Sequence, residues 1–467
     1  MIEKLKMQSG NTPTGEYSAD VLHREGVESS SLDVISTALG PPPMASYAAA
    51  HAYPEAAPAF VSQPFAERPG CPSGKLRLYL HIPFCNYSCS FCFFAIRVTK
   101  DQEPMQRYVQ ALKKELEWID EGTILSQLFV GGGTPTTLPP HLLDEVLAYV
   151  FARTMPDGTE VHTVEASPDS LTADHVRVLH RHGIGRVSMG IQTFNPELLE
   201  RVQRRHDAAQ AHSACRLLLD SGLIVNTDLM YGLPGQSQQD FADDFDSLAK
   251  LGVQSATVYD LRLNENTPVS RVIGEEEKLE IARLVRWRQF VRKVAEDLGY
   301  TQTRWHTFKR MDTIAASHER AAHHGPDGQG FQFGAGMSAR SQLGHTVYRN
   351  HANMNVYIDR VNAGQSPVEG VIALREEDRK TQFIARSLGD GKPLRRDDYE
   401  NAFKVAIDHD FGAVLQRLSD AELIADDGES LNLTETGRLV HDRVTYNFYP
   451  PHALEWLAQR QQLAAVK

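Results

Sequence analysis

Residues 76–92 read LRLYLHIPFCNYSCSFC, a strand-forming run that leads directly into three closely spaced cysteines. From this point onward, short β-forming runs alternate with amphipathic stretches in which apolar residues recur at helical spacing. The predicted strands cover residues 76–81, 124–130, 160–165, 186–191, 224–229 and 256–263. The predicted helices cover residues near 105–119, 141–151, 173–182, 208–220, 241–251 and 276–298.

This alternation predicts an α/β fold. Strands that alternate with helices at intervals of about 30 residues indicate right-handed βαβ units and a parallel sheet. Six such units can form an open partial barrel or a doubly wound sheet, and periodicity does not choose between them. In both, ligands bind beyond the carboxyl ends of the strands. Polar or glycine-rich residues lie at five predicted strand ends, so we expect one functional rim made of residues 81–92, residues 131–136, Glu165, Gln192 and Asp228.

The regions outside this core differ in composition. Residues 1–72 are predicted to be an irregular leader, because residues 41–69 are rich in Pro and Ala and show little apolar periodicity. A lid over the core is the alternative interpretation of the leader. Residues 73–370 would hold the main domain with an accessory segment. Residues 371–467 are predicted to form a small, winged-helix-like α+β domain, with short helices and a hairpin over 423–434.

Composition limits the class of protein. The chain has 467 residues, 41% of them apolar and 23% charged, which is typical of a soluble globular protein. The formal net charge of −12 argues against nucleic acid or an anionic membrane surface as the main partner. No apolar run approaches the roughly 20 residues of a membrane span, and a secretion signal is not evident at the N-terminus. We therefore predict a cytoplasmic protein and expect a monomer.

Five cysteines are too few and too unevenly spaced for a disulfide framework. Cys85, Cys89 and Cys92 fall within eight residues in a C-x3-C-x2-C pattern, and such thiolates favour zinc or an iron–sulfur cluster. A structural zinc would need a fourth ligand, which the neighbouring residues do not supply cleanly. Three thiolates on a four-iron cluster would leave one iron open. Three adjacent buried thiols without a metal are the remaining interpretation. Cys71 has no obvious partner, and Cys215 lies in a helical apolar stretch typical of a core.

The cysteine pattern, with an aromatic residue before its last Cys and YLHIPF before its first, resembles the radical S-adenosylmethionine (SAM) enzymes. More narrowly it is similar to the subgroup around oxygen-independent coproporphyrinogen III oxidase, the HemN-like proteins. The resemblance runs from about residue 64 to 449. Further motifs occur in the same order, namely GGGTPT at 131–136, EASP at 165–168, RVSMGIQ at 186–192 and DLMYGLPG at 228–235.

This resemblance implies a fold and a set of cofactors. The fold is a partial (β/α)6 TIM-like barrel with a small C-terminal domain. Cys85, Cys89 and Cys92 would bind a [4Fe-4S] cluster whose open iron chelates SAM, and a reductant such as flavodoxin or ferredoxin would supply the electron. Cleavage of SAM then gives a 5′-deoxyadenosyl radical, and the protein orients the reactants and excludes side reactions.

The resemblance also assigns residues to the first SAM. Tyr79 and Phe91 match positions that flank the cofactor, and an aromatic face can stack on adenine; core packing is the alternative for each. Gly132, Gly133 and Thr134 belong to the glycine-rich run that contacts the methionyl part of SAM, since residues without Cβ let the backbone approach a ligand. Glu165 suits a ribose hydroxyl or an ammonium group.

Three other residues match positions that hold a second SAM in coproporphyrinogen-oxidase-like proteins, namely Gln192, Arg204 and Asp228. The guanidinium of Arg204 suits a carboxylate, because it can pair with both oxygens. A surface charge is the alternative, since Arg201 and Arg205 lie nearby in the sequence. The sequence does not identify a catalytic acid or base.

One departure from the subgroup guides the choice of reaction. Coproporphyrinogen oxidases usually carry a further Cys two residues after the last cluster ligand, and here that position is Phe94. Phe94, the long leader and the YDLR segment at 259–262 favour the class C radical methyltransferases. These use two SAM molecules to transfer a methyl or methylene carbon to an sp2 carbon of a small natural-product precursor, by C-methylation or cyclopropanation. The alternatives are a coproporphyrinogen-oxidase-like or anaerobic haem-processing enzyme, and a non-catalytic haem chaperone.

Overall fold

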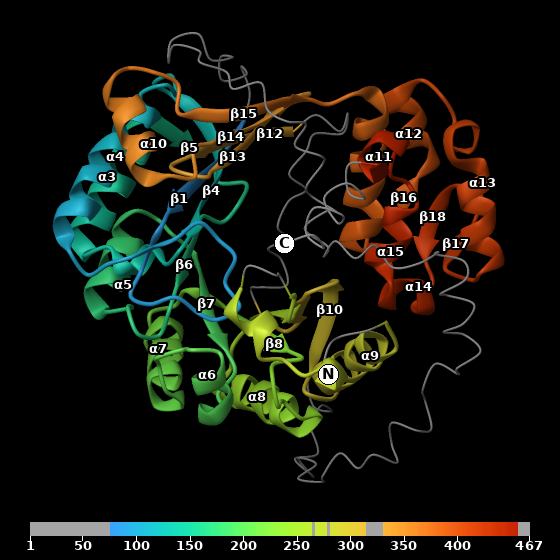
Figure 1. Cartoon of the computed structure of the whole chain (residues 1–467), viewed down its shortest axis with the longest axis horizontal. Helices are drawn as coiled ribbons and strands as arrows, with labels where there is room; N and C mark the ends of the chain where they lie inside the picture. Colours follow the sequence, from blue (N-terminus) through green and yellow to red (C-terminus); the bar gives the residue numbers. More distant parts are fainter. Residues whose placement is uncertain (1–74, 264–266, 278–280, 314–329, 456–467) are drawn as a thin grey trace, which may run out of the picture.

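The computed structural model describes residues 75–263, 267–277, 281–313 and 330–455. The predicted leader and Cys71 lie outside these residues. The described chain forms a strongly curved 13-stranded sheet with helices packed along its outer side (Figure 1). No helix in the described residues combines the length and apolar composition that crossing a bilayer requires.

Six parallel strands form the centre of this sheet. In chain order they are β1 (Leu76–Ile82), β4 (Thr123–Gly132), β6 (Thr163–Ala166), β7 (Arg186–Gln192), β8 (Ile224–Tyr231) and β9 (Ser255–Asp260). Their spatial order is β9-β8-β7-β6-β4-β1, so each strand lies beside its predecessor. A doubly wound sheet would reverse this order part-way. The fold is therefore a partial (β/α)6 TIM-like barrel, as the sequence resemblance implied.

The predicted helices are found close to their predicted positions. They are α3 (Gln102–Leu116), α4 (Pro140–Arg153), α5 (Ala173–Arg181), α7 (Ala208–Asp220), α8 (Gln238–Leu251) and α9 (Ile281–Asp297). Capping explains two of the starts, because the side chains of Asp207 and Ser237 accept backbone N–H bonds at the first turns of α7 and α8. The predicted start of the last helix at 276 is wrong, since residues Glu275–Glu277 form a separate 3-10 turn.

Strands at both ends of the sheet were not predicted individually. At one end lie β10 (Tyr300–Arg304) and β11 (Thr307–Arg310). At the other end lie β12 (Gly330–Ala335), β13 (Arg340–Gly344), β14 (Thr346–Asn350) and β15 (Val368–Ala373), of which β12 runs parallel to β1. Short strand β5 (Thr154–Pro156) pairs with β4, and helix α10 (Met354–Asn362) packs against α3.

Residues 376–455, here called the C-terminal unit, contain helices and a three-stranded sheet. Its helices are α11 (Glu376–Ser387), α12 (Arg396–Phe403), α13 (Ile407–Asp420), α14 (Glu435–Leu439) and α15 (His441–Tyr446). Its strands are β16 (Leu394–Arg395), β17 (Ile424–Asp426) and β18 (Ser430–Leu433), and β17 and β18 form the predicted hairpin.

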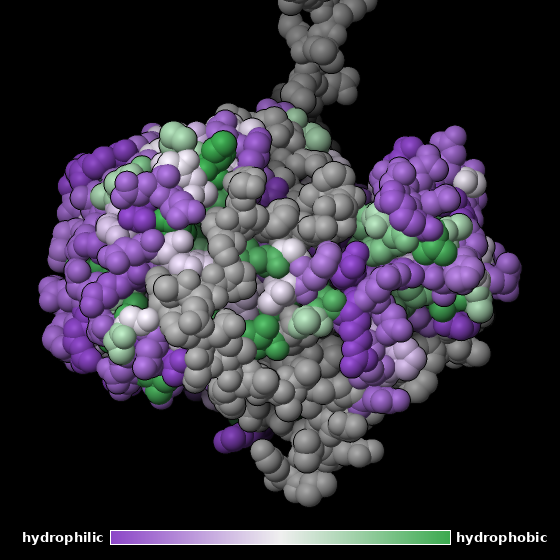
Figure 2. All heavy atoms as spheres, turned by 90° about the horizontal axis from the view of Figure 1, so that it is seen from above, coloured by the Kyte–Doolittle hydropathy of each residue, from purple (hydrophilic) through white to green (hydrophobic). Residues whose placement is uncertain are grey.

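The C-terminal unit has its own hydrophobic cluster, which also takes in Val285 of α9. Among the described residues, the unit contacts the barrel on two sides. On one side Gln382 and Arg386 bond to Gln342 of β13, and on the other Arg288 of α9 pairs with Asp442. In the space-filling view the unit stands beside the barrel, and its outer surface is mainly hydrophilic (Figure 2).

Candidate functional site

The three cysteines lie on a loop that follows β1. Two short strands, β2 (Phe84–Cys85) and β3 (Arg97–Val98), pair with each other and close this loop at its base. Cys85, Cys89 and Cys92 are free thiols, each partly buried, and the N–H of Cys92 donates to the carbonyl of Cys89 at 3.2 Å. We call residues 85–98 the cysteine loop.

The donor set of this loop fits a cluster held by three thiolates. Within the described residues, no group of three His, Cys, Asp or Glu lies close enough to hold a single metal ion; in a four-iron cluster each thiolate binds a different iron. Burial raises the pKa of the Cys85 thiol to about 12 and also raises the pKa of Cys92. Polar groups stand beside the sulfurs, because Arg204 Nη1 lies 3.5 Å from Cys89 Sγ and Thr134 Oγ1 lies 3.7 Å from Cys85 Sγ. Such neighbours suit sulfurs that become anionic when they bind iron.

The glycine run at the end of β4 is packed between β6 and the base of the cysteine loop. A Cβ at Gly131 would come within 2.7 Å of Glu165 Oε2, and one at Gly133 within 2.7 Å of the Pro83 carbonyl. Gly132 has φ of +114°, which disfavours other residues, and its N–H donates to Glu165 Oε2 at 3.2 Å. The run therefore fixes Glu165 and the cysteine loop relative to each other, a role that the sequence did not indicate.

The two predicted aromatic residues lie in different surroundings. Tyr79 stacks on Phe129 with ring centroids 6.1 Å apart, and its hydroxyl lies 3.1 Å from His81 Nδ1. Phe91 packs, half-buried, against a small hydrophobic cluster that includes Leu198. His81 was not singled out from the sequence, although it is buried directly beneath Gly132. Burial lowers the pKa of His81 to about 4, so this imidazole is neutral.

Arg204 reaches from the end of α6 (Pro196–Arg201) into the site. Its guanidinium donates to Cys89 Sγ, to Ser167 Oγ at 3.4 Å and to the Gly190 carbonyl, while its Nε is buried without a hydrogen-bond partner. The interpretation of Arg204 as a surface charge is therefore wrong. Gln192 lies beside the same face of Gly190, because a Cβ there would come within 3.2 Å of Gln192 Nε2 and 3.6 Å of Arg204 Nη2. Gln192 adopts a φ of 73°.

Asp228 lies on the neighbouring strand, where it is the register partner of Gly190. Its carboxylate accepts from Ser188 Oγ at 3.2 Å and from Asn226 Nδ2 at 3.0 Å. Burial raises the pKa of Asp228 to about 6. The expectation that Asp228 ends its strand is wrong, because β8 continues to Tyr231. The three residues predicted for a second SAM thus converge around one glycine.

Asp169 joins the cysteine loop to Arg204, and the sequence did not single it out. Its carboxylate accepts from Asn86 Nδ2 at 2.8 Å, from Tyr87 hydroxyl at 3.2 Å and from Ser167 Oγ. Burial by itself would raise the pKa of Asp169, but the bonds from Ser167 and Asn86 and the charge of Arg204 leave it below the ordinary value. Its position four residues after Glu165, beyond a predicted strand end, was the available signal.

Replacing Asp169 by Ala is expected to loosen the cysteine loop. The loss of the carboxylate leaves the donors of Asn86 and Tyr87 without their partner, at a cost of roughly 1–3 kcal/mol. We expect lower iron and sulfide content after anaerobic reconstitution, together with a lower melting temperature. Asp174→Ala on the exposed face of α5 is the matched control, because Asp174 is exposed and pairs with the exposed Arg177. Equal iron content in both variants would contradict the role given to Asp169.

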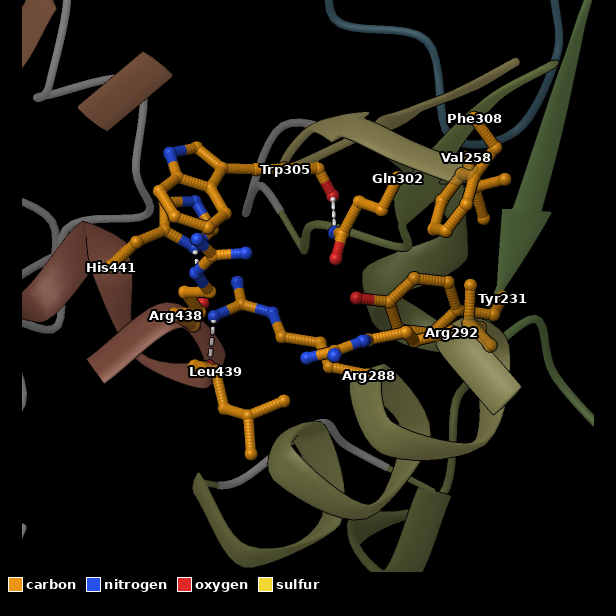
Figure 3. Close-up of a pocket in the computed structure, with 11 residues that line it drawn as sticks. Tyr231, Val258, Arg288, Arg292, Gln302, Trp305, Phe308, Arg438, Leu439 and His441 are labelled. Atoms are coloured by element: carbon orange, nitrogen blue, oxygen red, sulfur yellow. Dashed lines mark hydrogen bonds between the residues drawn. The ribbon is translucent and has the colours of Figure 1, made fainter. Parts of the chain in front are cut away.

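A small cavity lies where the C-terminal unit meets the barrel (Figure 3). It has a volume of about 20 Å³, enough for one water molecule but not for a cofactor. Arg288 lines it and donates to both carboxylate oxygens of Asp442 at 3.1 and 3.2 Å, while Trp305 stacks on His441 at 4.5 Å. The cavity also borders Tyr231, at the end of β8. This region therefore joins the C-terminal unit to the strand ends.

Comparison with known proteins agrees with this architecture. Residues 79–248 match the family model of the radical SAM superfamily. The haem chaperone HemW of Bacillus subtilis is 26% identical over 379 residues, which cover 78% of this chain and 97% of the relative. The oxygen-independent coproporphyrinogen III oxidase of Helicobacter pylori is 26% identical over 398 residues, covering 80% of this chain and 85% of the relative.

A solved structure shows the same relationship. Coproporphyrinogen III oxidase (HemN) from Escherichia coli, a radical SAM enzyme, matches with a TM-score of 0.71 and 25% identity, over 86% of this chain and 92% of that one. Proteins of this superfamily use a [4Fe-4S] cluster and SAM, which are accordingly the cofactors of this chain. Residues 79–248 thus form a radical SAM domain, and the chain is similar to the HemN and HemW proteins in its sequence and its fold.

Proposed function

We propose that Cys85, Cys89 and Cys92 hold the [4Fe-4S] cluster and that the chain abstracts a hydrogen atom from a small molecule of the tetrapyrrole class. The observation that carries this proposal is the convergence of three thiols, Glu165 and the partly buried Arg204 at adjacent strand ends. When bound, the cluster and SAM supply one-electron cleavage of a sulfonium bond and a 5′-deoxyadenosyl radical. The substrate class is proposed from the relatives, which are coproporphyrinogen oxidases and haem chaperones.

The chain's own residues bind and orient SAM in this proposal. The Glu165 carboxylate is held by the N–H of Gly132 and would accept from the ammonium group or a ribose hydroxyl. The Nε of Arg204 is buried without a hydrogen-bond partner and would donate to the carboxylate of a second SAM. Tyr79 and Phe129 would offer apolar ring surface beside these groups. The described site thus offers polar partners for both charged ends of an amino acid.

A second SAM is part of the proposal. Gln192, Arg204 and Asp228 lie around Gly190, one strand further along the sheet than Glu165. A carboxamide, a guanidinium and a buried carboxylate can together bind an amino-acid group by charge and hydrogen bonding. This arrangement supports two neighbouring SAM sites on one rim.

Methyl or methylene transfer is the second candidate reaction. The observation that favours it is the stacked pair Phe93 and Phe94, with ring centroids 4.8 Å apart, at the position where coproporphyrinogen oxidases usually carry a further Cys. Two SAM molecules are what such a reaction consumes. The relatives described above nevertheless favour tetrapyrrole chemistry over methyl transfer as the first candidate.

One anaerobic experiment separates these functions. The reconstituted chain is incubated with methyl-deuterated SAM, a reductant and either coproporphyrinogen III or haem, and the products are analysed by mass spectrometry. We expect unlabelled 5′-deoxyadenosine with substrate-dependent carbon dioxide or porphyrin modification. Deuterium in 5′-deoxyadenosine together with S-adenosylhomocysteine would instead establish methyl transfer. Stoichiometric haem binding without either nucleoside product would refute an enzymatic function and leave a haem carrier.

A further inference from the structure

We propose that Asp244, a buried carboxyl on helix α8, is a positioning residue for the second SAM, because it holds the backbone that follows β7 and so fixes the side chain of Gln192. This role rests on the proposed function, which places a second SAM beside Gln192, Arg204 and Asp228. Asp244 itself lies on one of the helices along the outer side of the sheet rather than at a strand end (Figure 1).

Gln192 lies at an irregularity in the sheet. β7 and β8 are in register at Gly190 and Asp228, but the next pair joins Gln192 to Leu229, so that Ile191 is an extra residue in β7. Gln192 has a φ of 73°, in the left-handed region that residues other than glycine rarely adopt. Bulges beside active sites commonly redirect a side chain, and such a backbone conformation persists only where its surroundings enforce it. We therefore looked for contacts that hold the residues directly after Gln192.

Asp244 provides such a contact. It is 1% exposed, and its Oδ1 accepts the N–H of Phe194, two residues after Gln192, at 2.6 Å. Thr193, the residue between them, is wholly buried, and its side chain also bonds to Asp244. A buried N–H that loses its partner is costly, so the bond to Asp244 determines the path of the backbone after Gln192.

The same helix holds the segment at a second point. Asp240, one turn before Asp244, accepts from Asn195 Nδ2 at 2.9 Å. Asn195 in turn caps the first turn of α6, which leads to Arg204. Two carboxyl groups of α8 thus hold the segment that begins at Gln192 and ends at Arg204, and both of these residues are proposed to bind the second SAM.

The surroundings of Asp244 also set its protonation. Burial raises the pKa of Asp244 to about 7, against the bonds from Phe194 and Thr193, which favour the ionised form. The nearby carboxylates of Asp240 and Asp243 add to the rise in pKa. Oδ2 of Asp244 is buried without a hydrogen-bond partner, so a proton on this oxygen leaves Oδ1 able to accept from Phe194. A neutral Asn side chain should therefore replace Asp at this position, whereas an apolar side chain should not.

A set of variants separates the hydrogen bond from packing. Asp244→Leu removes the acceptor but keeps a branched side chain, and Asp244→Asn keeps the acceptor. Asp244→Ala removes the same acceptor without adding apolar volume, and replaces Asp244→Leu in the experiment if that variant does not fold. Asp243→Ala is the matched control, because Asp243 precedes Asp244 on the same helix but is exposed and accepts from Gln239 at 2.8 Å.

The full chain is reconstituted anaerobically with its cluster, and the binding of radiolabelled SAM is measured by ultrafiltration. We expect the wild type to bind two SAM molecules per cluster. Asp244→Leu should weaken the second site about tenfold, and Asp244→Asn should stay within about threefold of wild type. Asp243→Ala should stay within about twofold. The first site should be unchanged in all variants, as reported by the effect of SAM on the electron paramagnetic resonance spectrum of the reduced cluster.

A double variant gives a result that general loosening of the fold would not produce. If Asp244 acts through Gln192, then in a Gln192→Ala background Asp244→Leu should change the affinity of the second site by less than about twofold. Independent effects would instead multiply, to about a hundredfold for the double variant, and would overturn the inference.

The same measurements separate failure of this inference from failure of the proposed function. If the wild type binds two SAM molecules and Asp244→Leu binds both as tightly as Asp243→Ala does, Asp244 has no positioning role while the proposed function stands. If the wild type takes up its cluster but binds a single SAM, the second SAM of the proposed function is refuted, and the role of Asp244 with it.

Discussion

Cys85→Ala, Cys89→Ala and Cys92→Ala are each expected to abolish SAM cleavage, whereas Cys215→Ala preserves it. Each of the first three removes one of three proposed thiolate ligands from a loop that offers no nearby replacement within the described residues. Cys215 is buried on α7 and behaves as a small apolar side chain.

The measurements are iron, acid-labile sulfide, the visible spectrum and 5′-deoxyadenosine formation after anaerobic reconstitution. The three variants should lose the cluster spectrum and produce no detectable 5′-deoxyadenosine. Cys215→Ala should retain both, with a modest loss of thermal stability from the missing sulfur. Full iron and sulfide content in Cys89→Ala would overturn the ligand assignment.

Glu115→Ala is expected to produce the largest loss of stability of any single substitution considered. Glu115 is wholly buried on α3 and accepts three hydrogen bonds. The donors are the N–H of Gly336 at 2.7 Å, Asn350 Nδ2 at 2.7 Å and the Tyr357 hydroxyl at 2.6 Å. Removing the carboxylate leaves these buried donors without it, so the free energy of unfolding should fall by about 3–5 kcal/mol.

Urea denaturation of the full chain under anaerobic conditions measures this loss. Glu115→Gln should be intermediate, because its amide keeps one acceptor oxygen but places an NH2 group against donors. Glu103→Ala on the exposed part of the same helix should stay within about 0.5 kcal/mol of wild type. An unfolding midpoint for Glu115→Ala equal to that of Glu103→Ala would refute the assignment.

The barrel was predictable because its signals are local. The predicted helix near 105–119 has apolar residues at helical spacing, and these residues, Met105, Tyr108, Val109, Leu112, Leu116 and Ile119, are all buried. The six parallel strands followed from alternation with helices, and the choice of a barrel came from the resemblance. The strands at the sheet edges were not predicted because they lack a clear apolar pattern of their own. In β10, for example, only Tyr300 is fully buried.

Glu115 and Asp169 were missed for a similar reason. Glu115 bonds to Gly336, 221 positions away, and Asp169 bonds to Asn86, 83 positions away. The periodicity of apolar residues does not reveal hydrogen bonds between residues so far apart in the sequence. The sequence did contain one signal for Glu115. It lies seven residues after Tyr108 and three after Leu112, which places a carboxylate on the apolar face of the helix. A charge in that position indicates a buried partner.

The two attachments of the C-terminal unit have a mechanical consequence. A partial barrel is an incomplete ring, and here one segment of the same chain reaches β13 on one side and α9 on the other. The Gln342–Gln382 amide pair and the Arg288–Asp442 ion pair thus attach the C-terminal unit to two separate parts of the barrel. The C-terminal unit therefore restrains the distance between β13 and α9. A truncated chain that lacks this unit would lose that restraint as well as the residues themselves.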